Sequence, residues 1–214
     1  MTTLTATRPS TTRPLLTAAA IAGPFFYAVA IAQMLTRDGF DLREHPISQL
    51  ATGSLGWIQM ISFVLTGLGV IALALARRRL ITEGTGRRAV PLLLGLYGGG
   101  FVVAGLFPMD PQNGFPAGAP AGPVALSWHS VVHSIGAVVA FTALAVACIV
   151  LVVDAVRRRS AKAAVGHGVV AVVMLLPMSP TESSLQIALT GVVAFTWTTL
   201  YAVQLRRLTD RRTR

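Results

Sequence analysis

The sequence predicts an all-α protein that crosses a membrane six times as a polytopic helix bundle, with both termini in the cytoplasm. First, 53% of the 214 residues are hydrophobic and only 12% are charged, about half the charged share of an ordinary soluble domain. Second, six apolar segments approach the length of about 20 residues that a helix needs to cross a bilayer. Third, the basic residues gather in alternate connections, as the positive-inside rule expects of cytoplasmic loops.

The predicted helices form one membrane domain, 15–205, between two short basic tails, 1–14 and 206–214. Their expected ranges are 15–36, 57–76, 89–107, 128–153, 163–178 and 185–205. The first tail is rich in Thr, Arg and Pro and has little apolar surface to bury, so we expect it to be disordered. The apolar run 15–36 is longer than the roughly 7–15 residues of a signal-peptide core, so we expect this helix to be retained.

Local residues support the individual helices. Pro24 removes an amide donor from the first helix, so another group must satisfy the carbonyl that it frees. Trp57 and Trp128 begin the second and fourth helices, where interfacial aromatic residues are expected. Small residues recur along the third helix and predict close packing against a neighbouring helix. They are Gly95, Gly99, Gly100, Ala104 and Gly105.

The sequence defines the fifth helix less clearly than the sixth. The fifth segment, 163–178, is the shortest of the six. The sixth is preceded by Ser179, Pro180, Thr181 and Glu182, which predict a capping box with Ser at the N-cap and Glu three residues later. Glu182 is therefore expected to be structural.

The distribution of charge predicts the orientation. All but two of the 18 lysines and arginines lie in the tails or in the loops after the second and fourth helices, and the two exceptions are Arg37 and Arg43. We therefore expect those loops in the cytoplasm and the protein in the plasma membrane. The net charge of +10 then belongs to the membrane flanks, so the expected partner is the lipid bilayer and not nucleic acid. Cys148, the single cysteine, excludes an internal disulfide.

The polar residues that need an explanation lie on the predicted outer side. His129 and His133 share a face of the fourth helix, since residues four apart are helical neighbours. Asp110 follows the third helix, and His45 and Ser48 lie in the first outer loop. Two imidazoles and a carboxylate could hold a zinc ion with an open position for water, so His129, His133 and Asp110 are a candidate metal site.

A structural role explains the same residues without any cofactor. In that interpretation His129 bonds the outer loop, His133 bonds a neighbouring carbonyl or serine, and Asp110 caps or turns the chain. Haem is a further alternative because the chain has four histidines, but His167 is expected at the inner end of the fifth helix, far from the others.

Three stretches of sequence on the outer side carry a family resemblance. They are 45–67, which begins His-Pro-Ile-Ser-Gln-Leu-Ala-Thr-Gly, 105–120, which contains Phe-Pro-Met-Asp-Pro, and Ser-Trp-His at 127–129. With these motifs the chain resembles the bacterial membrane family catalogued as domain of unknown function 998. The resemblance implies a multi-pass membrane protein whose recurrent residues gather on the outer side, and it implies no particular activity. His133 departs from the family pattern, where a small residue is usual.

Three functional hypotheses follow. The first is a membrane protein whose outer loops bind a lipid, a small molecule or a protein partner, with no cofactor. The second is a metal-dependent membrane hydrolase with zinc at Asp110, His129 and His133. The third is a small-molecule carrier, which is less favoured because the predicted helix interiors hold no ionisable group near mid-membrane.

Overall fold

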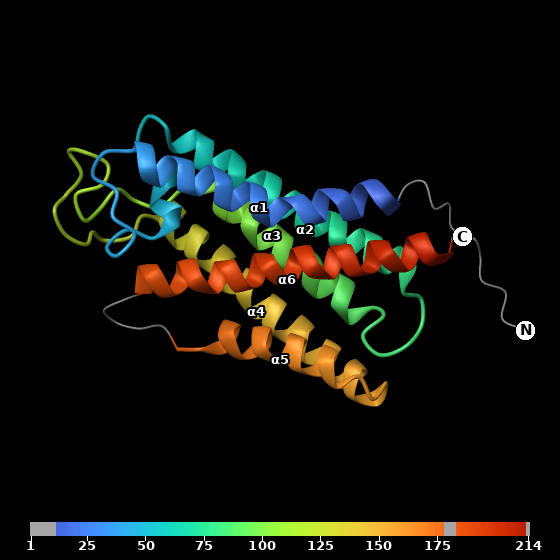
Figure 1. Cartoon of the computed structure of the whole chain (residues 1–214). Helices are drawn as coiled ribbons and strands as arrows, with labels where there is room; N and C mark the ends of the chain where they lie inside the picture. The colour runs from blue at the N-terminus through green and yellow to red at the C-terminus, as the bar shows by residue number, and fades with distance from the viewer. Residues whose placement is uncertain (1–11, 178–182, 213–214) are drawn as a thin grey trace, which may run out of the picture.

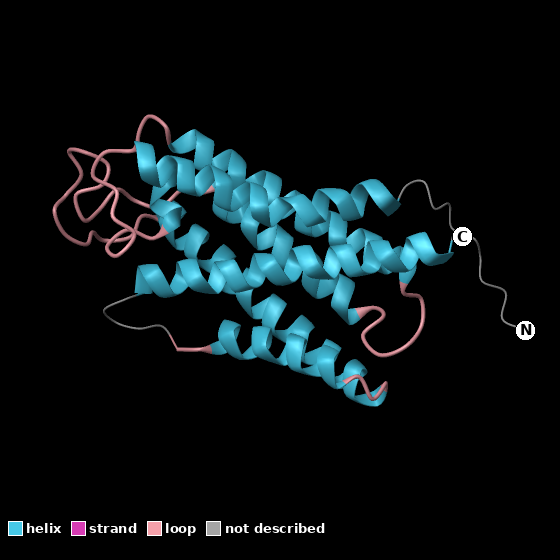
Figure 2. Cartoon of the chain, in the orientation of Figure 1, coloured by secondary structure: helices cyan, strands magenta, loops and turns pink. Residues whose placement is uncertain are grey.

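The computed structural model describes residues 12–177 and 183–212, and every regular element in these ranges is helical (Figures 1 and 2). The predicted all-α class and the six helices are confirmed. In chain order the elements are α1 (Thr12–Thr36), the short 3₁₀ helix η2 (Ile47–Ala51), α2 (Gly56–Leu80), α3 (Ala89–Leu106), α4 (Trp128–Arg157), α5 (Ala161–Leu175) and α6 (Ser183–Arg212). The predicted capping box at Ser179–Glu182 lies outside the described residues.

Five of the helices are long and apolar enough to cross a membrane: α1, α2, α3, α4 and α6. Helix α5 has 15 residues, or about 22 Å at 1.5 Å per residue, which is shorter than a hydrocarbon core of about 30 Å. The chain is therefore a multi-pass membrane protein with five clear spans and one short apolar helix.

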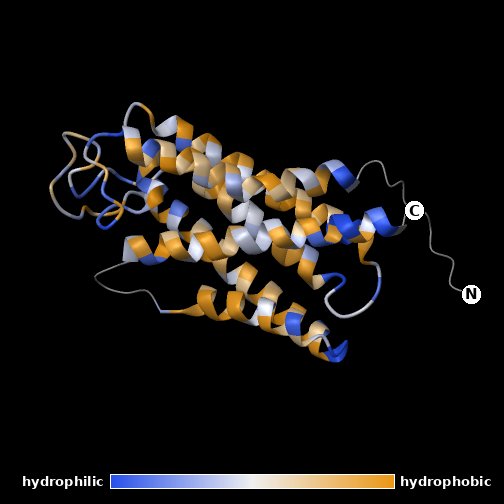
Figure 3. Ribbon diagram, in the orientation of Figure 1, coloured by the Kyte–Doolittle hydropathy of each residue, from blue (hydrophilic) through white to orange (hydrophobic). Residues whose placement is uncertain are grey.

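The bundle has two unlike ends. Helix α1 begins and α6 ends at the same end, where the α2–α3 loop and the α4–α5 turn also lie (Figure 1). This end is strongly hydrophilic, and we call it the basic end because it carries the arginine clusters (Figure 3). The segments 37–55 and 107–127 lie together at the opposite end, and we call them the loop cap.

Close helix contacts occur where glycines face each other. A Cβ on Gly98 of α3 would lie 2.5 Å from the Gly67 carbonyl oxygen of α2, and Gly100 of α3 meets Gly136 of α4 in the same way. The close packing predicted for α3 is thus confirmed at Gly100 and at Gly105, where a Cβ would lie 2.8 Å from the Met60 carbonyl oxygen of α2, whereas Gly95 and Gly99 face open space with nothing within 4 Å of a Cβ. Small residues therefore hold α3 between α2 and α4.

The proline in α1 is compensated by a neighbouring helix, as the sequence requires. Pro24 lies inside α1, and its missing amide frees the carbonyl of Ala20, four residues earlier. The Thr199 hydroxyl of α6 donates to that carbonyl at 3.0 Å. The α1–α6 contact thus satisfies a backbone group that has no water available in a membrane.

Most helix boundaries differ from the predicted ones by one to seven residues; the largest difference is at the end of α6, at Arg212 and not 205, and α4 ends at Arg157 and not 153. Helix α1 begins at Thr12, three residues before the expected start. Helix α2 continues through Arg77, Arg78 and Arg79 to Leu80, so these arginines belong to its last turn and not to the loop. A cation in the last turn interacts favourably with the helix dipole, which extends the helix beyond its apolar run. Arg77 is only 2% exposed.

Candidate functional site

His45 joins the two segments of the loop cap. Its ring is 2% exposed, its Nδ1 accepts from the Asp41 amide at 2.9 Å, and its Nε2 lies 2.9 Å from the Asn113 carbonyl oxygen. These partners assign the hydrogen to Nε2, because an amide donates and a carbonyl accepts. Both ring nitrogens are therefore engaged in holding residues 41 and 113 together.

Arg37 and Phe115 form the centre of the loop cap, and sequence reasoning missed both. The Arg37 guanidinium lies 4.7 Å from the centre of the Phe115 ring, and it donates to the carbonyls of Leu50 and Thr52. Burial lowers the pKa of Arg37 below its usual value, since desolvation disfavours the charged form. The sequence did contain one indication that Arg37 is unusual, because it is one of only two basic residues on the predicted outer side.

Asp110 and His129 meet at the start of α4, as the sequence predicted. The Asp110 carboxylate accepts from the Ser127 amide and hydroxyl, both at 2.7 Å, and lies 3.7 Å from His129 Nε2. Burial raises the pKa of Asp110, but the hydrogen bonds from Ser127 and the charge of His129 outweigh it, so the net pKa is lowered. His129 Nδ1 lies 2.9 Å from the Pro108 carbonyl oxygen and so carries a hydrogen.

Ser127, Asp110 and His129 do not form a nucleophilic triad. In such a triad the hydroxyl donates to the histidine, and the carboxylate orients that histidine. Here the Ser127 oxygen lies 2.9 Å from His129 Nε2, but its hydroxyl donates to Asp110 and it accepts from the Ser130 amide at 3.4 Å, as an N-cap of α4 does. His129 Nδ1 faces the Pro108 carbonyl and not a carboxylate, so no carboxylate orients the ring as a triad requires. The cluster therefore anchors the loop cap to the start of α4.

His133 and Ser48 lie apart from this cluster. His133 Nδ1 lies 2.9 Å from the carbonyl oxygens of both Ala104 and Phe107 at the end of α3, which lack helical partners there. Ser48 donates to the Met109 sulfur at 2.8 Å. In the ranges that the structure describes, no three His, Cys, Asp or Glu side chains gather as a metal site, and zinc binding at Asp110, His129 and His133 stays a prediction.

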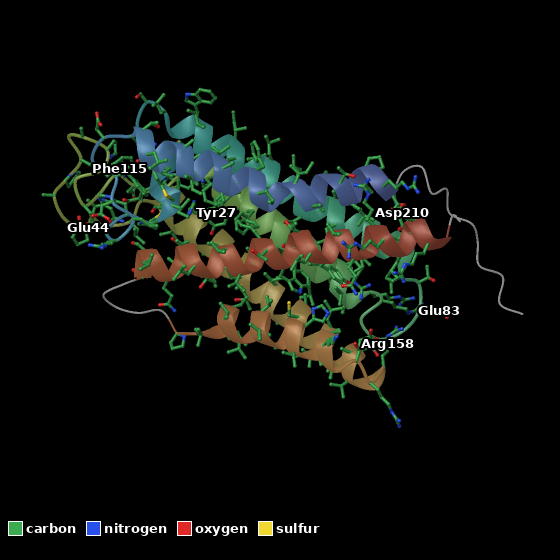
Figure 4. The ribbon with its side chains drawn as sticks, viewed as in Figure 1. Tyr27, Glu44, Glu83, Phe115, Arg158 and Asp210 are labelled. Carbon is green, nitrogen blue, oxygen red and sulfur yellow. The ribbon has the colours of Figure 1, made fainter. Side chains whose placement is uncertain are left out.

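A cavity of about 70 Å³ lies beneath the loop cap, inside the bundle. Its walls are mainly aromatic, with Phe26, Phe63, Phe101 and Phe195 among them. Three polar side chains also line it, namely Tyr27, Ser48 and His133. The Tyr27 hydroxyl donates to the Ala188 carbonyl of α6 at 2.6 Å. Figure 4 places Tyr27 on α1 within the bundle and Phe115 and Glu44 in the loop cap.

Comparison with known proteins identifies the family and no characterised relative. The family model described as "Protein of unknown function (DUF998)" matches residues 20–206. No curated protein and no solved structure matches the chain significantly. The matched region contains all five candidate residues, His45, Ser48, Asp110, His129 and His133, and covers far more than half of the chain. The chain therefore belongs to the DUF998 family.

Proposed function

We propose that this chain is a plasma-membrane protein with six crossings and cytoplasmic termini, and that its outer end binds a small amphiphilic ligand. The observation that carries the ligand proposal is the aromatic cavity with three polar side chains, roofed by the loop cap. Ligand sites are usually apolar hollows with a few polar groups that fix orientation. The loop cap is fixed by buried contacts such as His45 with Asn113, so it provides an ordered roof.

The orientation follows from charge. Among the described residues, all lysines and arginines except Arg37 and Arg43 lie toward the basic end, which the positive-inside rule assigns to the cytoplasm. Helix α4 runs toward the basic end and α6 starts from the loop-cap end (Figure 1). The segment between them must return through the bilayer, which supports α5 as the sixth crossing.

The cavity limits the ligand class. Its volume of about 70 Å³ is below the roughly 150 Å³ of an engineered cavity that binds benzene. The part of a ligand that enters without rearrangement is therefore smaller than benzene, such as the end of a short alkyl chain. With Nδ1 of His133 engaged by carbonyls, Nε2 is the ring's acceptor in its neutral form, so it suits a ligand hydroxyl.

The orientation is tested by cysteine labelling on intact cells. In a Cys148→Ala background, Ser54→Cys and Ser183→Cys report on the loop-cap end, and Thr82→Cys reports on the basic end. We expect a membrane-impermeant maleimide to label the first two directly and Thr82→Cys only after permeabilisation. Labelling of Ser183→Cys only after permeabilisation would remove the sixth crossing, and direct labelling of Thr82→Cys would reverse the orientation.

The ligand site is tested by photolabelling with a diazirine-bearing butanol in nanodiscs, read by peptide mass spectrometry. We expect adducts on cavity residues such as Phe63 and Tyr27, and we expect excess unlabelled butanol to suppress them. Ala137→Phe fills the cavity and should abolish these adducts, whereas Val138→Phe, on a side chain that is 66% exposed, should leave them unchanged. Adducts that unlabelled butanol does not suppress would contradict the proposal.

The other two hypotheses have less support. A zinc hydrolase could use Nε2 of His133, since a zinc-binding histidine commonly donates its other ring N–H to a carbonyl, but no three His, Cys, Asp or Glu side chains gather among the described residues. A carrier would need a path for its substrate, and the buried polar pair near the loop-cap ends of α1 and α2, Gln33 with Gln59 at 2.7 Å, carries no charge. We therefore propose neither.

A further inference from the structure

A second hollow lies at the basic end, between α5 and α6. Helix α5 packs extensively against α4 but only slightly against α6, which leaves a groove of about 580 Å³ that begins near Ser160 and Lys162. Farther along α5 and α6 its walls are apolar, with Val170, Val192 and Val193. The groove thus has a polar mouth and an apolar interior.

The mouth of this groove presents hydrogen-bond donors. Trp197 Nε1 donates to His167 Nδ1 at 3.0 Å, so the hydrogen of the neutral His167 ring is on Nε2. His167, Lys162 and Gln204 all line the groove. An ammonium, an imidazole N–H and an amide together suit an anion with several acceptor oxygens.

Arg77 adds an incompletely satisfied charge behind the groove. It is 2% exposed, and its Nε and Nη1 have no hydrogen-bond partner among the described residues. Its side chain interacts with Tyr201, which lines the groove, and its charge acts on His167. The nearby carboxylate of Asp154 is already held by Arg158 at 2.8 Å. A buried cation with free donors favours an anion close by.

We propose that the α5–α6 groove binds an anionic phospholipid, with its phosphate at Lys162, His167 and Gln204 and an acyl chain along the apolar walls. Charge complementarity selects the headgroup, and the apolar length of the groove selects a molecule with a tail. Basic pockets between helices at the cytoplasmic side are a general mode of anionic-lipid recognition. This site is separate from the proposed cavity under the loop cap.

The test uses the full chain in nanodiscs of equal parts phosphatidylglycerol and phosphatidylcholine, with retained lipids counted by native mass spectrometry. We expect retained phosphatidylglycerol to exceed phosphatidylcholine about fivefold or more, since one basic residue near the surface supplies about that factor. Both leaflets have the same composition, so the result depends neither on the orientation nor on the outer cavity. Equal retention of the two lipids would overturn the proposal.

Two pairs of variants localise the effect. Gly166→Leu fills the groove, and Gly99→Leu is its matched control, because both glycines face open space and Gly99 lines a different groove whose side chains carry no charge. Lys162→Gln removes a charge at the mouth, and Arg87→Gln removes one from an exposed loop. We expect Gly166→Leu and Lys162→Gln to bring the lipid ratio toward one and the two controls to keep it. An unchanged ratio in Gly166→Leu would place the lipid elsewhere and overturn the proposal.

Discussion

The two ends of the bundle both carry polar side chains within or beside the membrane, and the ionisable groups among them are satisfied differently, although the buried Gln49 amide of the loop cap also lacks a partner among the described residues. At the loop cap, His45, Asp110 and His129 each have close partners in the chain itself. At the basic end, Arg77 is buried with two nitrogens that lack a partner among the described residues. A ligand at the basic end can therefore supply hydrogen-bond acceptors that Arg77 lacks, whereas these three loop-cap side chains already have partners.

The difference shows that a polar cluster alone does not identify a site. The conspicuous histidines and the aspartate of the loop cap use their hydrogen-bonding capacity to fix two loops and the start of α4. Arg77, the first of three consecutive arginines, has two side-chain nitrogens for which the described chain provides no hydrogen-bond partner. A buried polar group needs a partner, so the incompletely satisfied group is the better indicator of a ligand.

The largest expected effect is at His45. His45→Phe keeps a ring between Phe40 and Phe115, whose centres lie 5.6 and 5.4 Å from the His45 ring, but leaves the Asp41 amide and the Asn113 carbonyl without their partner. We expect a loss of about 2–4 kcal/mol in unfolding free energy, because each unsatisfied buried group costs about 1–3 kcal/mol. Denaturant titration in mixed micelles measures it.

The control is Arg43→Gln in the same segment, where the side chain is exposed and the change should stay within about 0.5 kcal/mol. Equal effects of the two substitutions would mean that the loop cap is not held by His45, and the contrast between the two ends would fail.

A smaller effect is expected at Asp110. Asp110→Asn keeps an acceptor for the Ser127 amide but removes the charge, so we expect a loss of about 1–2 kcal/mol at pH 7. The lowered native pKa of Asp110 means that its ionised form stabilises the folded state above the ordinary aspartate pKa of about 3.9. That contribution disappears as the pH falls below this value toward the native pKa.

Unfolding curves of the wild type and Asp110→Asn between pH 7 and pH 3 test whether the stabilisation by Asp110 decreases as the pH falls. The two stabilities should converge as the pH falls, because the wild type loses what the variant never had. A constant difference across this range would show that the charge of Asp110 does not contribute.

The sequence was sufficient for the helices because membrane spans depend on length and local apolarity. It also placed Asp110 and His129 in one candidate cluster, since each lies next to a helix end on the same side, and their side chains approach to 3.7 Å. It could not predict the His45–Asn113 contact, because residues 68 apart meet only through the path of two loops. Nothing local in either segment specifies that meeting.

Arg77 shows a different limit of sequence reasoning. An apolar run ends at the first arginine, and the predicted second helix therefore ended at residue 76. The helix continues for another turn to Leu80, since backbone hydrogen bonds and the helix dipole do not require apolar side chains. That additional turn moves Arg77 from a solvated loop to a buried position.

The smallest expected effect is at Arg77 and depends on the lipid. In phosphatidylcholine nanodiscs Arg77→Met should change the unfolding free energy by less than about 1 kcal/mol, because the relief of a buried charge offsets the lost dipole interaction. When phosphatidylglycerol is added, the wild type should gain stability, since a ligand that binds only the folded state stabilises it. The variant should gain less. Arg87→Met, on an exposed side chain, should gain as much as the wild type. A large loss for Arg77→Met in phosphatidylcholine alone would mean that Arg77 is satisfied within the protein, as His45 is, and the two ends would no longer differ.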